Sequence, residues 1–116
     1  MNRVVLFELS SPNPELQARF FSTVFGWEVS EPQWGYRSAK TGASDEPGIN
    51  GGIAQGPDHF PRGTRLQIQV DSIDDLLAKA VENGASVTQP KMDFGDFYIA
   101  YIVDPTGVHL GLIQYK

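Results

Sequence analysis

The sequence predicts an α+β fold made of two successive β-α-β-β-β modules, at about residues 1–57 and 64–116. Two observations predict this fold. An apolar extended segment, an amphipathic helix and three short extended segments follow one another in the first half, and the same order begins again in the second half. The segment FGWEV after the first helix is also echoed by NGASV after the second. We therefore expect an internal duplication of one supersecondary unit.

The predicted strands are short and rich in Val, Ile, Leu and aromatic residues. The segment RLQIQV at 65–70 alternates most regularly, with Leu66, Ile68 and Val70 on one side, which we expect to be buried. The predicted strands are 3–10, 27–30, 35–40, 49–54, 65–70, 86–90, 97–103 and 108–114. The order of these elements alone also allows a ferredoxin-like α+β sandwich.

Two segments, 11–26 and 71–85, carry helix signals. Asn13 is suited to cap the first helix and Gly26 to end it, whereas Ser72 with Asp75 forms a capping-box pattern in the second. Apolar residues at helical spacing predict the sides that pack on the sheets. These residues are Leu16, Phe20 and Val24 with Phe21 beside them in the first helix, and Ile73, Leu77, Ala80 and Val81 in the second.

Composition excludes several classes of function. The 116 residues contain no cysteine, so disulfides and thiolate chemistry are excluded. The net charge of −5, without a cluster of Lys or Arg, argues against nucleic acid as a partner. No apolar run approaches the length of a membrane span, and no signal-like N-terminal stretch is present. We expect a cytoplasmic protein with neither a nucleic-acid nor a membrane partner.

Four segments together carry a resemblance to a known family: ARFFSTVFGWEV, GINGGI, VDSIDDLLAKAVENGASV and YIVDPTGVHLGLIQ. In this order and spacing they resemble the vicinal oxygen chelate superfamily, which includes glyoxalase I, bleomycin-resistance proteins and extradiol dioxygenases. The resemblance covers nearly the whole chain. It implies that the two modules form an open curled sheet, or cup, often paired as a homodimer. Superfamily members with metal-dependent chemistry bind a divalent ion inside this cup.

The metal-ligand positions implied by the resemblance carry unsuitable residues in this chain. The positions on the first strand of each module correspond to Leu6 and Arg65, and the position on the last strand corresponds to Gly111. In the fourth ligand region, GGIAQG, Gln55 alone offers a side-chain oxygen. Hard divalent ions need several converging oxygen or imidazole donors. We therefore expect neither a metal ion nor another cofactor, although Glu8 could serve a shifted site.

The sequence also offers candidate residues for binding an organic ligand. Polar groups on the inner faces of the predicted strands could form hydrogen bonds, and nearby aromatic rings could stack on a flat ligand. The candidates are Glu8, Trp34, Tyr36, Arg65, Gln67, Gln69, Tyr101 and His109. A structural or solvent-facing role is the competing interpretation for each of them. We expect His59 to be solvent-exposed, and the segment Asp104–Gly107 to form a turn rather than a metal site.

The leading functional prediction is a protein that binds a small organic molecule in the cup of the sheet without the usual metal centre. One alternative is a superfamily enzyme, a lyase or dioxygenase, with a relocated or absent metal. A second alternative is an accessory interaction domain. Metal analysis separates the first two possibilities, and a thermal-shift screen separates both from the third.

Overall fold

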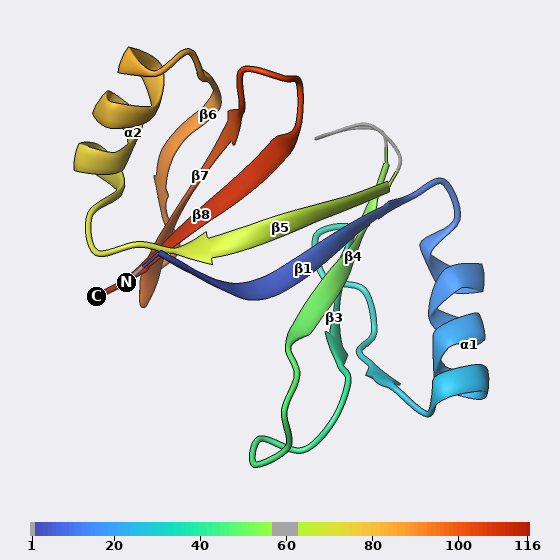
Figure 1. Ribbon diagram of the computed structural model, residues 1–116. Coiled ribbons are helices and arrows are strands. Elements are labelled where there is room, and N and C mark those ends of the chain that lie inside the picture. Colours follow the sequence, from blue (N-terminus) through green and yellow to red (C-terminus); the bar gives the residue numbers. More distant parts are fainter. Residues whose placement is uncertain (1, 57–62) are drawn as a thin grey trace. The chain divides into compact units, whose positions relative to one another are not determined.

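The computed structural model describes residues 2–56 and 63–116 of the chain (Figure 1). The strands are β1 (Arg3–Ser11), β2 (Glu28–Val29), β3 (Tyr36–Lys40), β4 (Asn50–Gln55), β5 (Gly63–Gln69), β6 (Ser86–Asp93), β7 (Phe97–Val103) and β8 (His109–Tyr115). The helices are α1 (Pro14–Phe25) and α2 (Ile73–Glu82). Neither described helix is long and apolar enough to cross a membrane. His59, which we expected to be solvent-exposed, lies outside the described residues.

The chain divides into two compact units. The N-terminal unit is Leu6–Arg65, and the C-terminal unit is Leu66–Lys116 together with the beginning of β1 up to Val5. In the N-terminal unit β1 pairs with β4 in parallel, and β4, β3 and β2 follow in antiparallel order. In the C-terminal unit β5 pairs with β8 in parallel, and β8, β7 and β6 follow in antiparallel order. The same β-α-β-β-β topology thus occurs twice, which confirms the predicted duplication and excludes the ferredoxin-like alternative.

Local capping explains where the helices begin and end. The Asn13 side chain accepts a hydrogen bond from the Leu16 N–H at 3.1 Å, and Ser72 Oγ accepts one from the Asp75 N–H at 3.2 Å. Gly26 ends α1 in a left-handed conformation, with a φ of 74°, which glycine adopts without steric cost. These interactions confirm the capping residues predicted from the sequence.

The predicted buried face of α1 is wrong for three of its four residues, because only Phe21 is half-buried. Leu16, Phe20 and Val24 are 57%, 54% and 55% exposed. The helix instead packs on its own sheet through Ala18, which is 7% exposed, and through Phe21, whose ring stacks on Trp27 at a centroid distance of 4.6 Å. The physical reason is that α1 has apolar residues on two sides, and the small Ala18 side chain lets the helix approach the sheet on one of them.

The core of the C-terminal unit forms between α2 and the sheet. Its buried residues are Val70, Ile73, Ala100, Ile102 and Leu112. Ile73, Leu77, Ala80, Ile68 and Val70 are buried or half-buried there, as predicted.

Two other apolar residues of this unit were predicted to be buried and are exposed. Leu66 is 40% exposed and Val81 is 53% exposed. The helix α2 packs mainly on β6, β7 and β8, so it does not cover Leu66 in β5. Val81 lies on an exposed side of α2. The apolar side of the C-terminal sheet is therefore only partly covered.

The β7–β8 turn is built from the predicted segment Asp104–Gly107. One Asp104 carboxylate oxygen accepts hydrogen bonds from the Thr106 N–H at 2.8 Å, the Thr106 hydroxyl at 2.7 Å and the Val108 N–H at 2.9 Å. Gly107 has a φ of 96°, a conformation that favours glycine. The structural interpretation of this segment is confirmed.

Candidate functional site

A buried ion pair lies on one face of the sheet of the N-terminal unit, the side to which Glu8 of β1 points. We call this side the polar face. Arg65 at the start of β5 donates to Glu8 of β1 through Nε at 3.0 Å and through Nη2 at 2.9 Å, with both bonds ending on Oε1. Both residues are only 3% exposed. Charged side chains are rarely buried to this extent unless they are paired, and here each supplies the other's counter-charge. The two sequence candidates Glu8 and Arg65 are thus brought together.

The other side chains on this face follow from strand alternation. Leu6, Glu8 and Ser10 point to the same side of β1, and their partners in β4 include Gly52 opposite Glu8. Ser10 is only 5% exposed. Tyr36 of β3 extends over Gly52, where a Cβ atom would overlap the phenol oxygen. The face therefore combines a neutralised ion pair, a hydroxyl and an aromatic ring.

Gly51 and Gly52 serve close packing rather than phosphate binding. A side chain at Gly51 would meet the ring of Phe7 on the helix side of the sheet, and one at Gly52 would meet Tyr36 on the opposite side. Glycines inside a strand are typical of a bulge or of a close backbone approach. The regular β1–β4 register shows that close approach is the correct interpretation.

A second polar group lies within the C-terminal unit. Gln67 of β5 and Tyr101 of β7 flank Gly111 of β8 in the register of the sheet. A Cβ atom at Gly111 would lie 2.8 Å from Gln67 Cγ and 3.0 Å from Tyr101 Cε1. Gln67 is 3% exposed. The candidates Gln69 and His109 point to the same side by alternation, and both are half-buried.

Trp34 lies apart from the strand positions predicted for it. The sequence placed Trp34 and Tyr36 on one face of an alternating strand, but β3 begins only at Tyr36. Trp34 sits in the preceding turn with a φ of 57°, and it is 97% exposed. The left-handed turn breaks the alternation, so only Tyr36 of this aromatic pair reaches the polar face.

The residues at the implied ligand positions do not fit a divalent metal ion. Leu6 has no donor atom, and Arg65 is a cation bound to Glu8, the carboxylate that could have served a shifted site. Gly111 has no side chain, and the space beside it is filled. Gln55 directs Nε2 at the carbonyls of Pro12 and Gly56, both at 3.3 Å.

The acidic and imidazole residues of the described chain also fail to gather into a metal site. Within residues 2–56 and 63–116, no group of three or more His, Asp or Glu side chains could hold a metal ion. The donor chemistry therefore disagrees with the metal centre that the superfamily resemblance implies for metal-dependent members.

Exposed ion pairs of the C-terminal unit shift the pKa values of their members. The Lys116 ammonium donates to Asp93, which lowers the pKa of that carboxyl and raises the pKa of Lys116. A hydrogen bond with Asp74 raises the pKa of Lys91 in the same way. Lys91 and Lys116 also lie over the ring of Tyr98, with centroid distances of 4.8 and 4.7 Å. The Lys91–Asp74 pair joins β6 to α2, and the Lys116–Asp93 pair joins the residue after β8 to the end of β6. These residues were not among the predicted site residues.

The sequence interpretation missed Ser10 and Gly52 as parts of the polar face. The period-two alternation of β1, read from Glu8, contains the signal for Ser10. The close approach of Tyr36 to Gly52 depends on the β3–β4 register, in which Ser38 pairs with Gly52 and Tyr36 with Ala54. No local sequence pattern carries that register.

Comparisons with known proteins agree with this architecture. A family model described as a glyoxalase-like domain matches residues 5–113. No curated protein sequence matches the chain. Among solved structures, a glyoxalase/bleomycin resistance protein/dioxygenase superfamily member from Vibrio splendidus 12B01 is similar with a TM-score of 0.70 and 18% identity, covering 100% of both chains.

Two further similar structures have other functions in their names. A methylmalonyl-CoA epimerase in complex with methylmalonyl-CoA and NH4+ has a TM-score of 0.69 and 15% identity, covering 99% of this chain and 95% of that chain. An NAD-dependent benzaldehyde dehydrogenase from Legionella pneumophila has a TM-score of 0.67 and 19% identity, covering 96% and 98%. At these identities the similarities show a shared fold alone.

Proposed function

The chain belongs to the glyoxalase-like domain family, and from this premise we propose that it binds a small organic molecule on the polar face of the N-terminal unit without a resident divalent metal ion. The observation that carries the proposal is the buried Glu8–Arg65 ion pair. A guanidinium occupies a position where metal-dependent relatives are expected to present a ligand, and it engages the nearest carboxylate.

The chemistry of this face favours a ligand without net charge. The guanidinium and the carboxylate balance each other, so the buried pair leaves no surplus charge at this face. Ser10 and Tyr36 add neutral hydroxyl groups, and Tyr36 adds an aromatic surface. A molecule with carbonyl, hydroxyl or amide groups beside a flat or apolar part matches this set. That one structurally similar protein holds methylmalonyl-CoA supports an organic ligand in general terms.

A thermal-shift screen tests the proposal directly. Protein treated with a chelator is incubated with neutral, anionic and cationic small molecules, and hits are measured by calorimetry. A ligand that binds only the folded state at about 100 times its Kd stabilises that state by about 2.7 kcal/mol. We expect neutral polar compounds to raise the melting temperature equally with and without chelator.

Matched phenol variants locate the binding site. Tyr36→Phe removes the hydroxyl on the polar face, and we expect it to weaken binding about tenfold, the effect of one hydrogen bond worth about 1.4 kcal/mol. Tyr115→Phe removes an exposed hydroxyl elsewhere and serves as the control. If binding requires one divalent ion per chain, the metal-dependent enzyme alternative replaces this proposal. If no compound of the screen binds, the accessory-domain alternative replaces it.

A further inference from the structure

We propose that a hollow between α2 and the sheet of the C-terminal unit binds an aliphatic carboxylate, with its hydrocarbon chain in the hollow and its carboxylate on Lys79. This site is separate from the polar face of the N-terminal unit, and binding here does not require a ligand on that face. Two features support this class of ligand, namely the aliphatic lining of the hollow and the lysine at its edge.

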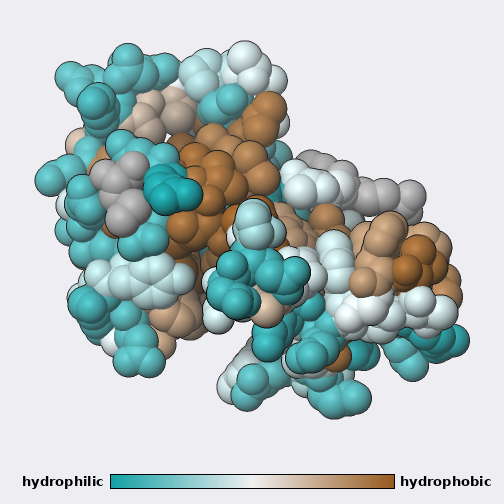
Figure 2. Space-filling model, turned by 60° about the horizontal axis from the view of Figure 1, so that its bottom comes forward, coloured by the Kyte–Doolittle hydropathy of each residue, from teal (hydrophilic) through white to brown (hydrophobic). Residues whose placement is uncertain are grey.

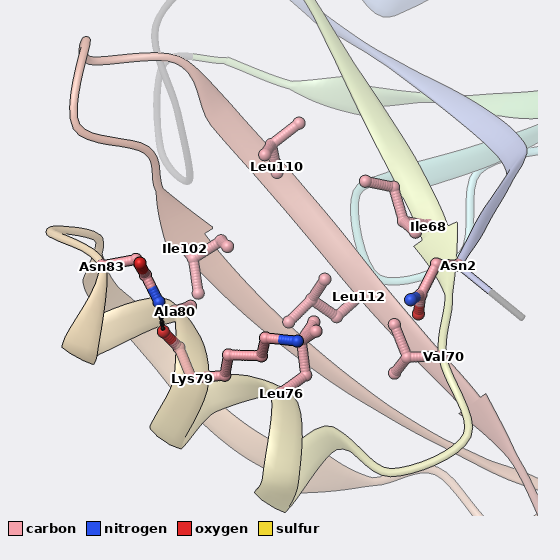
Figure 3. A pocket seen from close by; sticks show the side chains of 10 residues that line it. All are labelled: Asn2, Ile68, Val70, Leu76, Lys79, Ala80, Asn83, Ile102, Leu110 and Leu112. Carbon is pink, nitrogen blue, oxygen red and sulfur yellow. Dashed lines mark hydrogen bonds between the residues drawn. The ribbon is translucent and has the colours of Figure 1, made fainter.

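Apolar side chains gather on the face of the molecule that Figure 2 presents, where they form a broad brown area. Within the C-terminal unit, a hollow of about 350 Å³ lies between α2 and the helix side of the sheet (Figure 3). It exists because α2 packs mainly on β6, β7 and β8 and leaves the apolar side of β5 partly uncovered. Pockets for small organic molecules begin at about 300 Å³ and have mostly apolar walls. The aliphatic residues of this lining include Ile68, Val70, Leu76, Ile102, Leu110 and Leu112.

The lining favours an aliphatic chain over a flat aromatic ligand. Ile68, Leu76 and Leu110 are only half-buried, so part of this aliphatic surface stays in contact with water. A hydrocarbon chain in the hollow would remove that surface from water, which is favourable. The described lining contains no aromatic ring on which a flat ligand could stack.

Lys79 supplies a positive charge at the edge of the hollow. Its side chain extends across the hollow from α2 (Figure 3). Among the described residues no carboxylate forms an ion pair with Lys79, whereas Lys91 and Lys116 of the same unit are bound to Asp74 and Asp93 at 2.9 Å. A carboxylate head group would supply this counter-charge through a charge-assisted hydrogen bond.

The other polar residues of the lining are compatible with an anion. Asn2 borders the hollow, and its side-chain amide is a hydrogen-bond donor that suits a carboxylate. Asn83 donates its own amide to the Lys79 carbonyl oxygen at 2.8 Å and so holds the last turn of α2 beside the hollow. The described lining includes no acidic residue that would repel a carboxylate. The charge at the hollow thus favours an anionic head group over an amine.

Titration calorimetry of the full chain with decanoate, below the concentration at which it forms micelles, measures binding. We expect decanoate to bind about tenfold more tightly than octanoate, because it buries two more methylene groups at about 0.8 kcal/mol each. Decylamine, with the same chain and the opposite charge, should bind more weakly than decanoate. No binding of decanoate, or decylamine binding as tightly as decanoate, would overturn the proposal.

Substitution of Lys79 tests the role of its charge. Lys79→Met keeps an apolar side chain and removes the ammonium, and we expect it to weaken decanoate binding about tenfold. Binding of decanol, which has no charge, should stay unchanged. Lys40→Met, at an exposed lysine of β3, is the matched control. Equal affinities of wild type and Lys79→Met for decanoate would overturn the proposed role of the lysine.

Filling the hollow tests where the chain of the ligand lies. Ala80 lines the hollow from α2, and Ala80→Leu is expected to weaken decanoate binding at least tenfold by occupying part of the space. Should this variant fail to fold, the methyl NMR signals of Ile68 and Leu110 in the wild type locate the ligand, and decanoate is expected to shift both. Tyr36→Phe should leave decanoate binding unchanged, which separates this site from the polar face. Unshifted methyl signals, or weaker decanoate binding after Tyr36→Phe, would place the ligand elsewhere and overturn the proposal.

Discussion

At the residue scale, the proposed function depends on Glu8 and Arg65. Burying both charges is costly unless they are paired, and the two hydrogen bonds on Glu8 Oε1 compensate part of that cost. A buried ion pair is weak evidence for stability, because well-packed apolar residues stabilise as much or more. We propose that the pair serves instead to position a ligand on the polar face of the N-terminal unit.

Breaking the pair has a predictable consequence. Arg65→Met leaves Glu8 buried without its counter-charge, and we expect it to lower the free energy of unfolding by about 3–5 kcal/mol. The double variant Glu8→Leu with Arg65→Met removes both charges, and its loss should be much smaller. Urea denaturation of the two variants measures the difference. A double variant as unstable as the single one would contradict this account of the pair.

Asp104 is the residue that organises the β7–β8 turn, and its effect on stability depends on pH. The N–H of Val108 and then the Thr106 hydroxyl lower the pKa of this carboxyl below its ordinary value. A lowered pKa in the folded state contributes stability above the unfolded value, near pH 4, and that contribution is lost as the pH falls through the folded value.

Asp104→Ala should therefore lower the melting temperature at pH 7, and the difference from wild type should shrink as the pH falls below about 4. Melting curves from pH 7 to pH 2 measure the effect. Asp45→Ala, in an exposed loop, is the matched control. A difference that stays constant over this range would show that the turn depends on shape rather than on the ionised carboxylate.

At the scale of elements, α1 carries apolar residues on two sides, and only one of these sides packs within its own unit. Phe21 stacks nearly parallel to Trp27, at an interplanar angle of 7°, and binds α1 to its sheet. Phe20, its neighbour, contacts the Phe21 ring edge-on at a centroid distance of 5.6 Å, but it is 54% exposed. The two phenylalanines thus test which face carries the fold.

Phe21→Ala should cost roughly 2 kcal/mol, less than the loss for a fully buried phenylalanine because Phe21 is half-buried. Phe20→Ala should cost below about 1 kcal/mol, the range of a surface substitution. Both free energies are measured by chemical denaturation at a concentration where the chain is monomeric. Equal losses would mean that Phe20 packs inside the monomer as Phe21 does.

The elements themselves could be predicted from sequence, because their signals are local. Asn13 and Ser72 cap their helices within three residues, and the Asp104–Gly107 turn closes within four. The buried face of α1 could not be predicted, because the helix has two apolar stripes and nothing local chooses between them.

The site could be predicted only in part, because it depends on contacts between distant residues. Glu8 and Arg65 were each recognisable as polar residues of inner strand positions, but their pairing joins segments far apart in the sequence. Trp34 was misplaced because one left-handed turn residue shifts the start of β3.

At the scale of the whole molecule, one module occurs twice and carries different chemistry each time. The polar face of the N-terminal unit holds an ion pair, whereas that of the C-terminal unit holds Gln67 and Tyr101 around Gly111. Two proteins with this fold, 15% and 19% identical to this chain, are named as an epimerase and a dehydrogenase. The fold is thus a shared scaffold, and the two units differ in the polar side chains that each one carries.

A crystal structure of chelator-treated protein soaked with a hit from the thermal-shift screen tests the central claim most directly. The account predicts an uncharged organic ligand on the face of Glu8, Arg65 and Tyr36, with the ion pair intact and no metal ion beside it. A divalent ion coordinated by Glu8 or His109, with Arg65 displaced, would contradict it.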